Sequence, residues 1–541
     1  MRILRNILVL IFILLISDIF PAVAETEEKE PETLFVMGIG EQELSFNPVL
    51  AHTSMEIQVL TALYEGLLTY HPFTLEPVPG TAYKWIISEN KLKYNFFIRD
   101  NACYSNGEQV EAFHFVDTFL YNLDPKVDAG YSVYLDVIKG AKDFREGKNT
   151  DPSSVGIRAV SEKELEFTLN KPASHFLKIL CLLNFAPIHP SYKNKKDWDK
   201  AESLITNGPF SIYSRTAKEI VLSKNKYYWD TDQVKIDGIK LMFFDDPELL
   251  AKEVNIGKIH WTSLNYCSYQ DLDAASREKI IPNSMFATSF LFFVCNEKPW
   301  DNPKVRKGLA LLMPWKELRS QEYSLYPTNR LVPEIPKYPE VKGISQSTEE
   351  GLKLLEEAGY PKGKGLPPLV ILVTKNGTFY ADKIKESWEK VLSLEVKYKE
   401  VESREYFSAL REHDYTVSSY TWIGDFADPL AFLQMWTSES NLNEALYFNK
   451  DYDSLIEESL SVIGLDRYKK LAAAEELLLQ QATIMPIDHI AAFNVLEFDI
   501  IGGWFPNPLD IHPLKYIEFR GSKMNKWIAR DNGESKEKPT S

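Results

Sequence analysis

Residues 207–229 read NGPFSIYSRTAKEIVLSKNKYYW, and the pattern of the chain changes at this stretch. Residues 210–213 and residues 219–222 predict the two strands of a hairpin, and residues 236–244 predict a further strand after it. We therefore expect this region to contribute neighbouring strands to a sheet.

Strands and helices alternate on both sides of this region. Short alternating or apolar runs predict strands, whereas apolar residues at intervals of three and four predict helices. The predicted strands are residues 34–39, 93–98, 165–169, 369–373 and 395–398, and the predicted helices are residues 57–68, 111–120, 304–313, 348–358 and 380–392. This alternation favours an α/β fold with mixed sheets.

The N-terminus predicts export. Two arginines precede an apolar run at residues 7–16, and an Ala-Val-Ala sequence at residues 22–24 suits a cleavage site. This is the layout of a secretory signal peptide, because a membrane-spanning helix needs about twice as many apolar residues. The first cysteine is Cys103, which excludes a lipid anchor on a cysteine directly after the signal. We expect a signal peptide at residues 1–24 and a periplasmic protein that is not a lipoprotein; a buried helix is the alternative.

Length and charge limit the class of protein. The 541 residues carry a net charge of −16, which argues against nucleic acid and an anionic membrane surface as partners. The length exceeds what a single core supports, so about two to four domains are expected. Residues 521–541 are polar and without periodicity, which predicts a disordered tail.

The four cysteines allow two interpretations. Cys103 with Cys181 and Cys267 with Cys295 would each join residues within one plausible domain, but all four could equally be free buried thiols. Their spacing is too wide for a zinc or redox motif.

No catalytic motif occurs in the sequence. There is no G-x-S-x-G elbow, H-E-x-x-H helix, P-loop or G-x-G-x-x-G turn, and the histidines are scattered. We therefore expect no catalytic residues, no metal site and no cofactor, and a protein that is not an enzyme. An exported hydrolase without a recognisable motif is the alternative.

A series of short segments resembles a known family. The segments are SFNP (45–48), YEGL (64–67), VPG (78–80), residues 82–107, NGPF (207–210), NKYYW (225–229), NPKVRKGL (302–309), LLEEAGYP (354–361), WIGDFADP (422–429) and NPLDIH (507–512). In this order they resemble family 5 of the extracellular solute-binding proteins of ABC transporters, the oligopeptide- and dipeptide-binding group. The resemblance covers about residues 34–519.

The resemblance implies an α/β, type II periplasmic-binding-protein fold with two lobes, a hinge and an extra domain. The three domains are discontinuous, because the chain crosses between the lobes. The expected segments are residues 33–80, 204–290 and 490–520 for lobe I, residues 81–203 for the extra domain II, and residues 291–489 for lobe III.

The resemblance also implies a binding site without catalytic groups. Asp425 matches the aspartate that pairs with a peptide α-ammonium, and Trp422 and Phe426 would flank it as apolar walls. Asp425 could instead cap a helix or pair with a surface lysine. Asp428, directly before a proline, is expected to be a helix N-cap.

Further ligand contacts follow from the same resemblance. The residues are His52, Thr53 and Ser54 in one loop, Tyr131 in a pocket, and Thr262 and Asn265 after a turn. Gly208 is expected to form a turn at the cleft rather than a direct contact. For Tyr131 the alternative is ordinary core packing.

The resemblance implies a monomeric peptide receptor that delivers its ligand to an inner-membrane ABC permease. The same fold could instead bind a nickel complex, a sugar, haem or a signalling peptide. An exported chaperone or adhesin is an alternative of a different class.

Overall fold

The computed structural model describes residues 31–521, except Glu43, Asp128, Ser174, Asn194, 201–203, 321–325, Pro336, Asn376, 403–404, Asp425 and Ile463. The predicted signal peptide and residues 522–541 of the predicted tail lie outside the described residues, as does Asp425.

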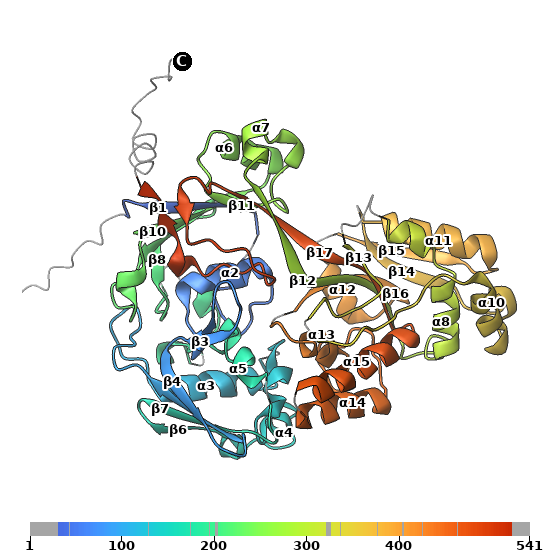
Figure 1. Ribbon diagram of the computed structural model, residues 1–541, viewed down its shortest axis with the longest axis horizontal. Coiled ribbons are helices and arrows are strands. Elements are labelled where there is room, and N and C mark those ends of the chain that lie inside the picture. The colour runs from blue at the N-terminus through green and yellow to red at the C-terminus, as the bar shows by residue number, and fades with distance from the viewer. Residues whose placement is uncertain are drawn as a thin grey trace, which may run out of the picture.

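One mixed sheet extends through most of the molecule (Figure 1). Its eleven strands, counted over the described residues, include one short strand, β13 (Tyr326–Pro327), that pairs beside β17. The order of the other ten is β15 (Val396–Val401), β14 (Leu369–Thr374), β16 (Val417–Ile423), β12 (Ile280–Phe293), β17 (Ile484–Leu496), β11 (Trp261–Ser263), β1 (Leu34–Gly40), β10 (Gly238–Phe244), β9 (Glu219–Lys224) and β8 (Phe210–Arg215). The antiparallel β8–β9 pair confirms the predicted hairpin, and β10 is the predicted strand after it.

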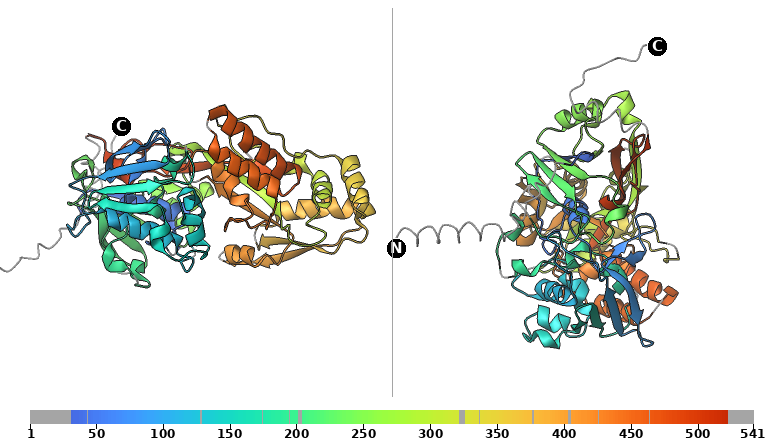
Figure 2. Two further views of the ribbon diagram at one scale, coloured as in Figure 1. Left: turned by 90° about the horizontal axis from the view of Figure 1, so that it is seen from below. Right: turned by 90° about the vertical axis from the view of Figure 1, so that its left-hand side faces the viewer.

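The molecule has two bodies side by side, joined by this sheet (Figure 2). We call the body that contains β1 and β8–β11 lobe I, and the body that contains β14–β16 lobe III. The helices of lobe I are α2 (Ser54–Leu63), α6 (Pro247–Asn255) and α7 (Ala274–Arg277). The helices of lobe III are α8 (Pro303–Leu311), α9 (Trp315–Leu318), α10 (Thr348–Glu357), α11 (Phe379–Val391), α12 (Tyr406–Glu412), α13 (Leu430–Leu433), α14 (Lys450–Ser461) and α15 (Gly464–Gln480).

The strands β12 and β17 cross between the lobes (Figure 1). Their pairing is interrupted between Ser284 and Thr288. There the backbone N–H of Phe286 donates to the carbonyl of Pro508 (2.7 Å), and the Phe286 carbonyl accepts from Gly424 (2.8 Å). The crossing therefore loses ladder hydrogen bonds at the point where the lobes meet, which suits a hinge.

Domain II is built on a separate antiparallel sheet next to lobe I (Figure 1). Its strands, in order, are β4 (Ala82–Ile87), β5 (Lys93–Ile98), β7 (Glu164–Thr168) and β6 (Ile157–Ser161), and its helices are α3 (Ala112–Leu123), α4 (Ala141–Arg145) and α5 (Phe176–Ile179). The ring of Phe119 on α3 packs edge-on against Phe167 on β7, with centroids 5.0 Å apart. This contact holds the helix on the sheet.

The helix predicted at residues 57–68 begins and ends earlier, as α2. Thr53 and Glu56 form a capping box that starts the helix at Ser54. At its end, the N–H of Gly208 donates to the Leu63 carbonyl (2.8 Å), and Tyr64 is already extended. Of the remaining predicted residues, 64–67 lie in no helix or strand, and Leu68 begins β2 (Leu68–Tyr70), which forms a short hairpin with β3 (Pro77–Pro79).

The disulfide interpretation is wrong, because all four cysteines are free thiols. Cys181, Cys267 and Cys295 are buried, and burial raises the pKa of each of these three thiols. The Cys181 thiol donates to the carbonyl of Leu177 (3.4 Å). Buried cysteines of this kind pack as small apolar residues.

A buried carboxylate joins distant segments of lobe I. Glu65 is 4% exposed, and its oxygens accept from the Tyr228 hydroxyl (2.5 Å), the Trp229 indole (2.5 Å) and the Lys515 ammonium (3.0 Å). The amide of Asn207 brackets the backbone of Glu65, accepting from its N–H (3.2 Å) and donating to its carbonyl (2.7 Å). Segments up to 450 residues apart are thus held at one side chain.

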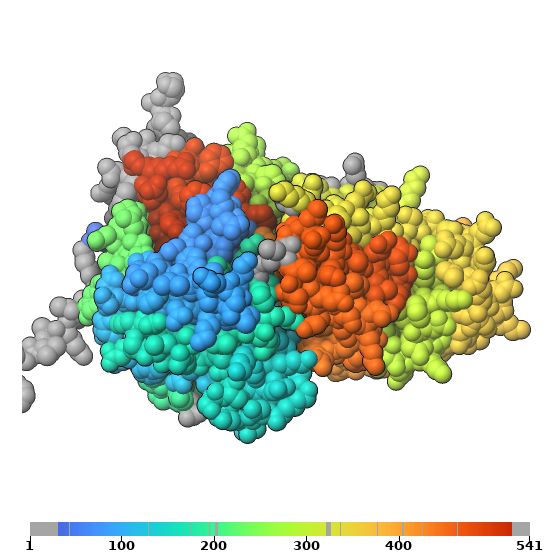
Figure 3. All heavy atoms as spheres, turned by 60° about the horizontal axis from the view of Figure 1, so that its bottom comes forward, coloured from blue at the N-terminus to red at the C-terminus, as the bar shows by residue number. Residues whose placement is uncertain are grey.

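Domain II also contacts lobe III directly (Figure 3). The fully buried ring of Phe426 packs edge-on against Tyr134 (5.5 Å) and stacks on His175 (6.2 Å, 14° between planes). The Lys178 ammonium donates to the carbonyl of Ala427 (3.0 Å). These contacts use side chains and loops rather than shared strands, so the two parts can separate without breaking a sheet.

His175 is 1% exposed at this contact, and neither ring nitrogen has a partner among the described residues. Burial, followed by the nearby charge of Arg467, lowers the pKa of His175 to about 3. Lys178 acts in the same direction, whereas Asp428 opposes it. The folded protein therefore holds this ring neutral.

Replacing Glu65 should destabilise the protein strongly. Glu65→Gln leaves the Lys515 ammonium buried without its carboxylate, and we expect a loss of about 3–5 kcal/mol in the free energy of unfolding. Urea denaturation measures it. The double variant Glu65→Gln/Lys515→Met removes both charges and should lose less than the sum of the single changes. A loss below about 1 kcal/mol for Glu65→Gln would contradict this account.

The stability should depend on pH through His175. An unfolded histidine titrates near pH 6.5, so below that pH the unfolded chain binds a proton that the folded chain excludes. Above pH 6.5, His175 leaves the free energy of unfolding unchanged. Below it, His175 lowers the free energy of unfolding by about 1.4 kcal/mol per pH unit as the pH falls towards 3. His175→Gln should flatten the pH dependence of the unfolding free energy by that amount between about pH 5.5 and 4.5.

The matched control is His71→Gln, because His71 is exposed. It should keep the wild-type slope. Equal slopes for His175→Gln and the wild type would show that the ring titrates freely in the folded protein.

Candidate functional site

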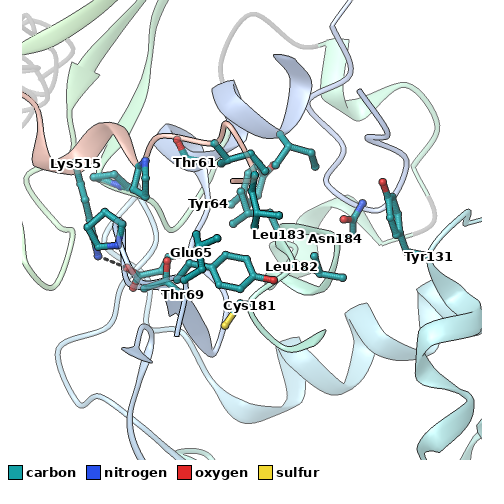
Figure 4. A pocket seen from close by; sticks show the side chains of 18 residues that line it. Thr61, Tyr64, Glu65, Thr69, Tyr131, Cys181, Leu182, Leu183, Asn184 and Lys515 are labelled. Carbon is teal, nitrogen blue, oxygen red and sulfur yellow. Dashed lines mark hydrogen bonds and ion pairs between the residues drawn. The ribbon is translucent and has the colours of Figure 1, made fainter. Parts of the chain in front are cut away.

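A cavity of about 80 Å³, partly open to solvent, lies where lobe I and domain II meet (Figure 4). Its lining comes from α2, from the β2 hairpin, from residues 181–184 and from residues 509–515 of the C-terminal segment. These segments are far apart in the sequence, and the ion pair of Glu65 with Lys515 joins the end of α2 to the C-terminal segment.

The two ends of the cavity differ. At one end the Glu65–Lys515 ion pair lies in the wall, as Figure 4 shows. At the other end lies Tyr131, whose ring is 5.9 Å from that of Tyr134. Tyr134 in turn contacts Phe426, so this end borders the contact between domain II and lobe III. Tyr131 is thus a predicted site residue that does line a cavity.

The loop before α2 is organised by a residue that the sequence analysis missed. The buried carboxylate of Glu56 accepts from the backbone N–H groups of Ser45 (3.0 Å), His52 (3.1 Å) and Thr53 (3.0 Å). The Thr53 hydroxyl accepts from the Glu56 N–H and donates to its carboxylate, so it is occupied by the helix cap. The capping-box spacing was the signal that could have found Glu56.

The side chains of His52 and Ser54 differ from that of Thr53. The His52 side chain is 65% exposed, with Nδ1 3.2 Å from the carbonyl of Leu50. Ser54 is also exposed, at the first position of α2. Both are accessible to a ligand that approaches this loop.

Trp422 and Phe426 flank the predicted amine anchor in the chain. Trp422 lies on β16, 8% exposed, and its indole donates to the carbonyl of Ala431 (2.8 Å). Phe426 is buried against domain II. These two rings are therefore packed within the protein. Asp425 itself lies outside the described residues.

Asp428 caps a helix, as predicted. Its Oδ1 accepts from the N–H of Leu430 (3.0 Å) at the start of α13. It also forms a buried bidentate pair with Arg467, at 2.8 and 2.7 Å, which the sequence did not indicate. Burial alone would raise the pKa of Asp428, but Arg467 holds it below its ordinary value.

The remaining predicted residues have separate roles. Thr262 is fully buried in β11, so the structure does not support a direct ligand contact there. Asn265 is exposed. Gly208 is buried, and a Cβ at this position would lie 2.3 Å from the Leu63 carbonyl carbon. Only glycine permits this approach to the end of α2, which agrees with a backbone role.

Two further searches cover only the part of the chain that the structure describes. Within it, no cluster of three or more histidine, cysteine or carboxylate groups is placed to hold a metal ion. Within the same residues, no helix combines the length and apolar character needed to cross a bilayer.

Comparisons with known proteins agree with this geometry. Residues 76–444 match the bacterial extracellular solute-binding proteins, family 5, middle region. The oligopeptide-binding protein OppA of Bacillus subtilis is 27% identical over 485 residues, covering 85% of this chain and 88% of its own.

Two solved structures share the fold over nearly their whole length. A periplasmic oligopeptide-binding protein of Borrelia burgdorferi gives a TM-score of 0.78 at 27% identity, covering 90% of this chain and 100% of its own. The murein tripeptide binding protein MppA of Escherichia coli gives 0.79 at 25% identity, covering 90% and 99%. The fold is the type II periplasmic-binding-protein fold with an additional domain, and the chain belongs to family 5 of the bacterial extracellular solute-binding proteins.

Proposed function

We propose that this protein is the peptide-binding component of an ABC importer, which captures oligopeptides or dipeptides and delivers them to an inner-membrane permease. The cavity between lobe I and domain II is the observation that carries the proposal. It borders the contact of domain II with lobe III, and lobe III is attached to lobe I through the two strands β12 and β17. The names of the relatives, an oligopeptide-binding and a murein tripeptide binding protein, support it.

Capture proceeds by closure of lobe III over lobe I and domain II. The proposed moving unit is residues 291–489, and residues 33–80, 204–290 and 490–520 together with domain II (81–203) form the other side. Hinge bending at β12 and β17 breaks few ladder hydrogen bonds, because the ladder between them is already interrupted there. Closure removes the ligand from water, so every ligand charge then needs a partner.

Asp425 is the proposed partner of the peptide α-ammonium. An ammonium buried without a carboxylate costs several kcal/mol, so a single anchor of this type selects ligands with a free amino end. The support is sequence based: Asp425 lies in the WIGDFADP segment, between the buried Trp422 and Phe426.

Peptide backbone is proposed to bind at the loop before α2, near His52 and Ser54, and near Asn265. Extended pairing with backbone groups is insensitive to side chains, which suits a receptor for mixed peptides. Thr53 supports this loop through its cap rather than by contact.

The setting proposed for this function is the periplasm. The signal peptide at residues 1–24 would be removed, no lipid anchor would follow, and the receptor would act as a monomer without a cofactor.

Native mass spectrometry of the purified protein, followed by denaturation, tests the proposal. We expect intact co-purified peptides. Asp425→Asn should weaken peptide binding by at least about thirtyfold, because losing one member of a buried charge pair costs roughly 2 kcal/mol or more. Calorimetry with an amino-free peptide and its N-acetylated form measures the same contact.

The control is Asp466→Ala, since the Asp466 side chain is 75% exposed on lobe III. It should bind peptide as the wild type does. A bound sugar or metal complex in place of peptide would refute the peptide assignment. Turnover of a bound peptide would instead indicate a hydrolase.

A further inference from the structure

The wall of the cavity is mostly apolar. Nine of its eighteen lining residues are aliphatic or proline side chains from five separate segments, among them Ile57, Leu75, Leu182, Pro209, Leu509 and Ile511. Covering an apolar wall with an apolar ligand group strengthens binding, whereas burying an unpaired polar group against it weakens binding.

The polar groups in the wall are mostly occupied by the protein itself. Each of four side chains donates to a backbone carbonyl, so its hydrogen is not available to a ligand. The pairs are Thr61 to Gln58 (2.7 Å), Tyr70 to Lys178 (3.1 Å), Cys181 to Leu177 (3.4 Å), and Asn184 to both Pro48 (2.8 Å) and Ala51 (2.9 Å).

The two charges in the wall compensate each other. The Glu65 carboxylate accepts three hydrogen bonds, from Tyr228, Trp229 and Lys515. The Lys515 ammonium contacts both Glu65 and the Tyr228 hydroxyl (3.2 Å). A charged ligand group placed here would meet a neutral pair and would give up its water without a counter-ion.

The position of the cavity relates it to the ligand's amino end. From Tyr131, two ring contacts lead to Phe426, which follows Asp425 in the sequence. A peptide whose amino group meets Asp425 can therefore place one of its first few side chains at the mouth of this cavity.

We propose that this cavity is a side-chain pocket that selects peptides with a large apolar residue, aromatic or long aliphatic, near the amino end. This inference rests on the proposed function and specifies its ligand class. Burial of one such side chain strengthens binding by about ten- to a hundredfold relative to alanine, because it removes apolar surface from water without leaving a polar group unpaired.

A peptide series tests the selectivity. Calorimetry compares tetrapeptides of alanine in which position 1, 2 or 3 is Phe, Leu, Lys or Glu. At one of these positions we expect Phe and Leu to bind at least about tenfold more tightly than Ala, and Lys and Glu more weakly than Ala.

Filling the cavity tests the assignment to this pocket. Thr69 lies half-buried in its wall on β2. Thr69→Trp should reduce the preference for Phe over Ala to less than about threefold. Thr61→Phe, on α2, is the second variant in case the first fails to fold. The control Thr348→Trp, at the exposed start of α10 in lobe III, should keep the full preference.

The outcomes separate this inference from the proposed function. Peptide binding with no preference at any of the three positions, or with a preference for Lys or Glu, overturns the pocket and leaves the peptide receptor standing. A preference that survives in folded Thr69→Trp and Thr61→Phe overturns the assignment to this cavity. Absence of peptide binding altogether refutes the proposed function itself.

Discussion

The buried carboxylate of Glu65 is the interaction on which the arrangement of lobe I depends. Four segments meet at it: the end of α2, the turn before β8, the turn after β9, and the C-terminal segment. A carboxylate at this depth requires several donors, and here they come from two distant parts of the chain: Tyr228 and Trp229 after β9, and Lys515 near the C-terminus. The C-terminal segment therefore returns to the part of the molecule that contains Glu65 and β1. One wall of the cavity contains Glu65 and its partner Lys515.

The two crossing strands connect the lobes, and the contact between domain II and lobe III forms on the proposed closure. β12 and β17 provide the covalent and sheet connection, with an interrupted ladder where bending is needed. The rings of Phe426, Tyr134 and His175 provide a contact that can form and separate without loss of secondary structure. Protonation of the buried, neutral His175 at low pH disfavours this contact. Separation of the two parts would also expose apolar surface, because buried residues of domain II and lobe III belong to one continuous hydrophobic cluster.

Short sequence patterns predicted the features that residues close together in the sequence determine. The β8–β9 hairpin and β10 follow from alternating residues, and the Asp-Pro sequence predicted the cap at Asp428. Arg467 lies 39 residues away from Asp428, so no local pattern could indicate their ion pair. The early end of α2 depends on the approach of Gly208, which is equally remote in sequence. The cavity could not be predicted for the same reason, because its wall combines residues near 60, 131, 182 and 511. Thr262 matched by resemblance but is buried, because resemblance locates a segment and not the direction of its side chain.

A receptor for many peptides must bind the features that all peptides share and still gain enough free energy to close. The proposed charge pair at the amino end and the proposed pairing with the backbone satisfy the first need, and neither discriminates between side chains. The proposed pocket adds the second, since its polar groups are mostly paired within the described part of the protein, although the buried Tyr64 hydroxyl is not, so that apolar surface strengthens binding and an unmatched charge weakens it. The pairing of Lys515 with Glu65 is decisive here. If either charge stood alone in the wall, the cavity would select the opposite charge; because both are present and bonded, it selects for the absence of charge.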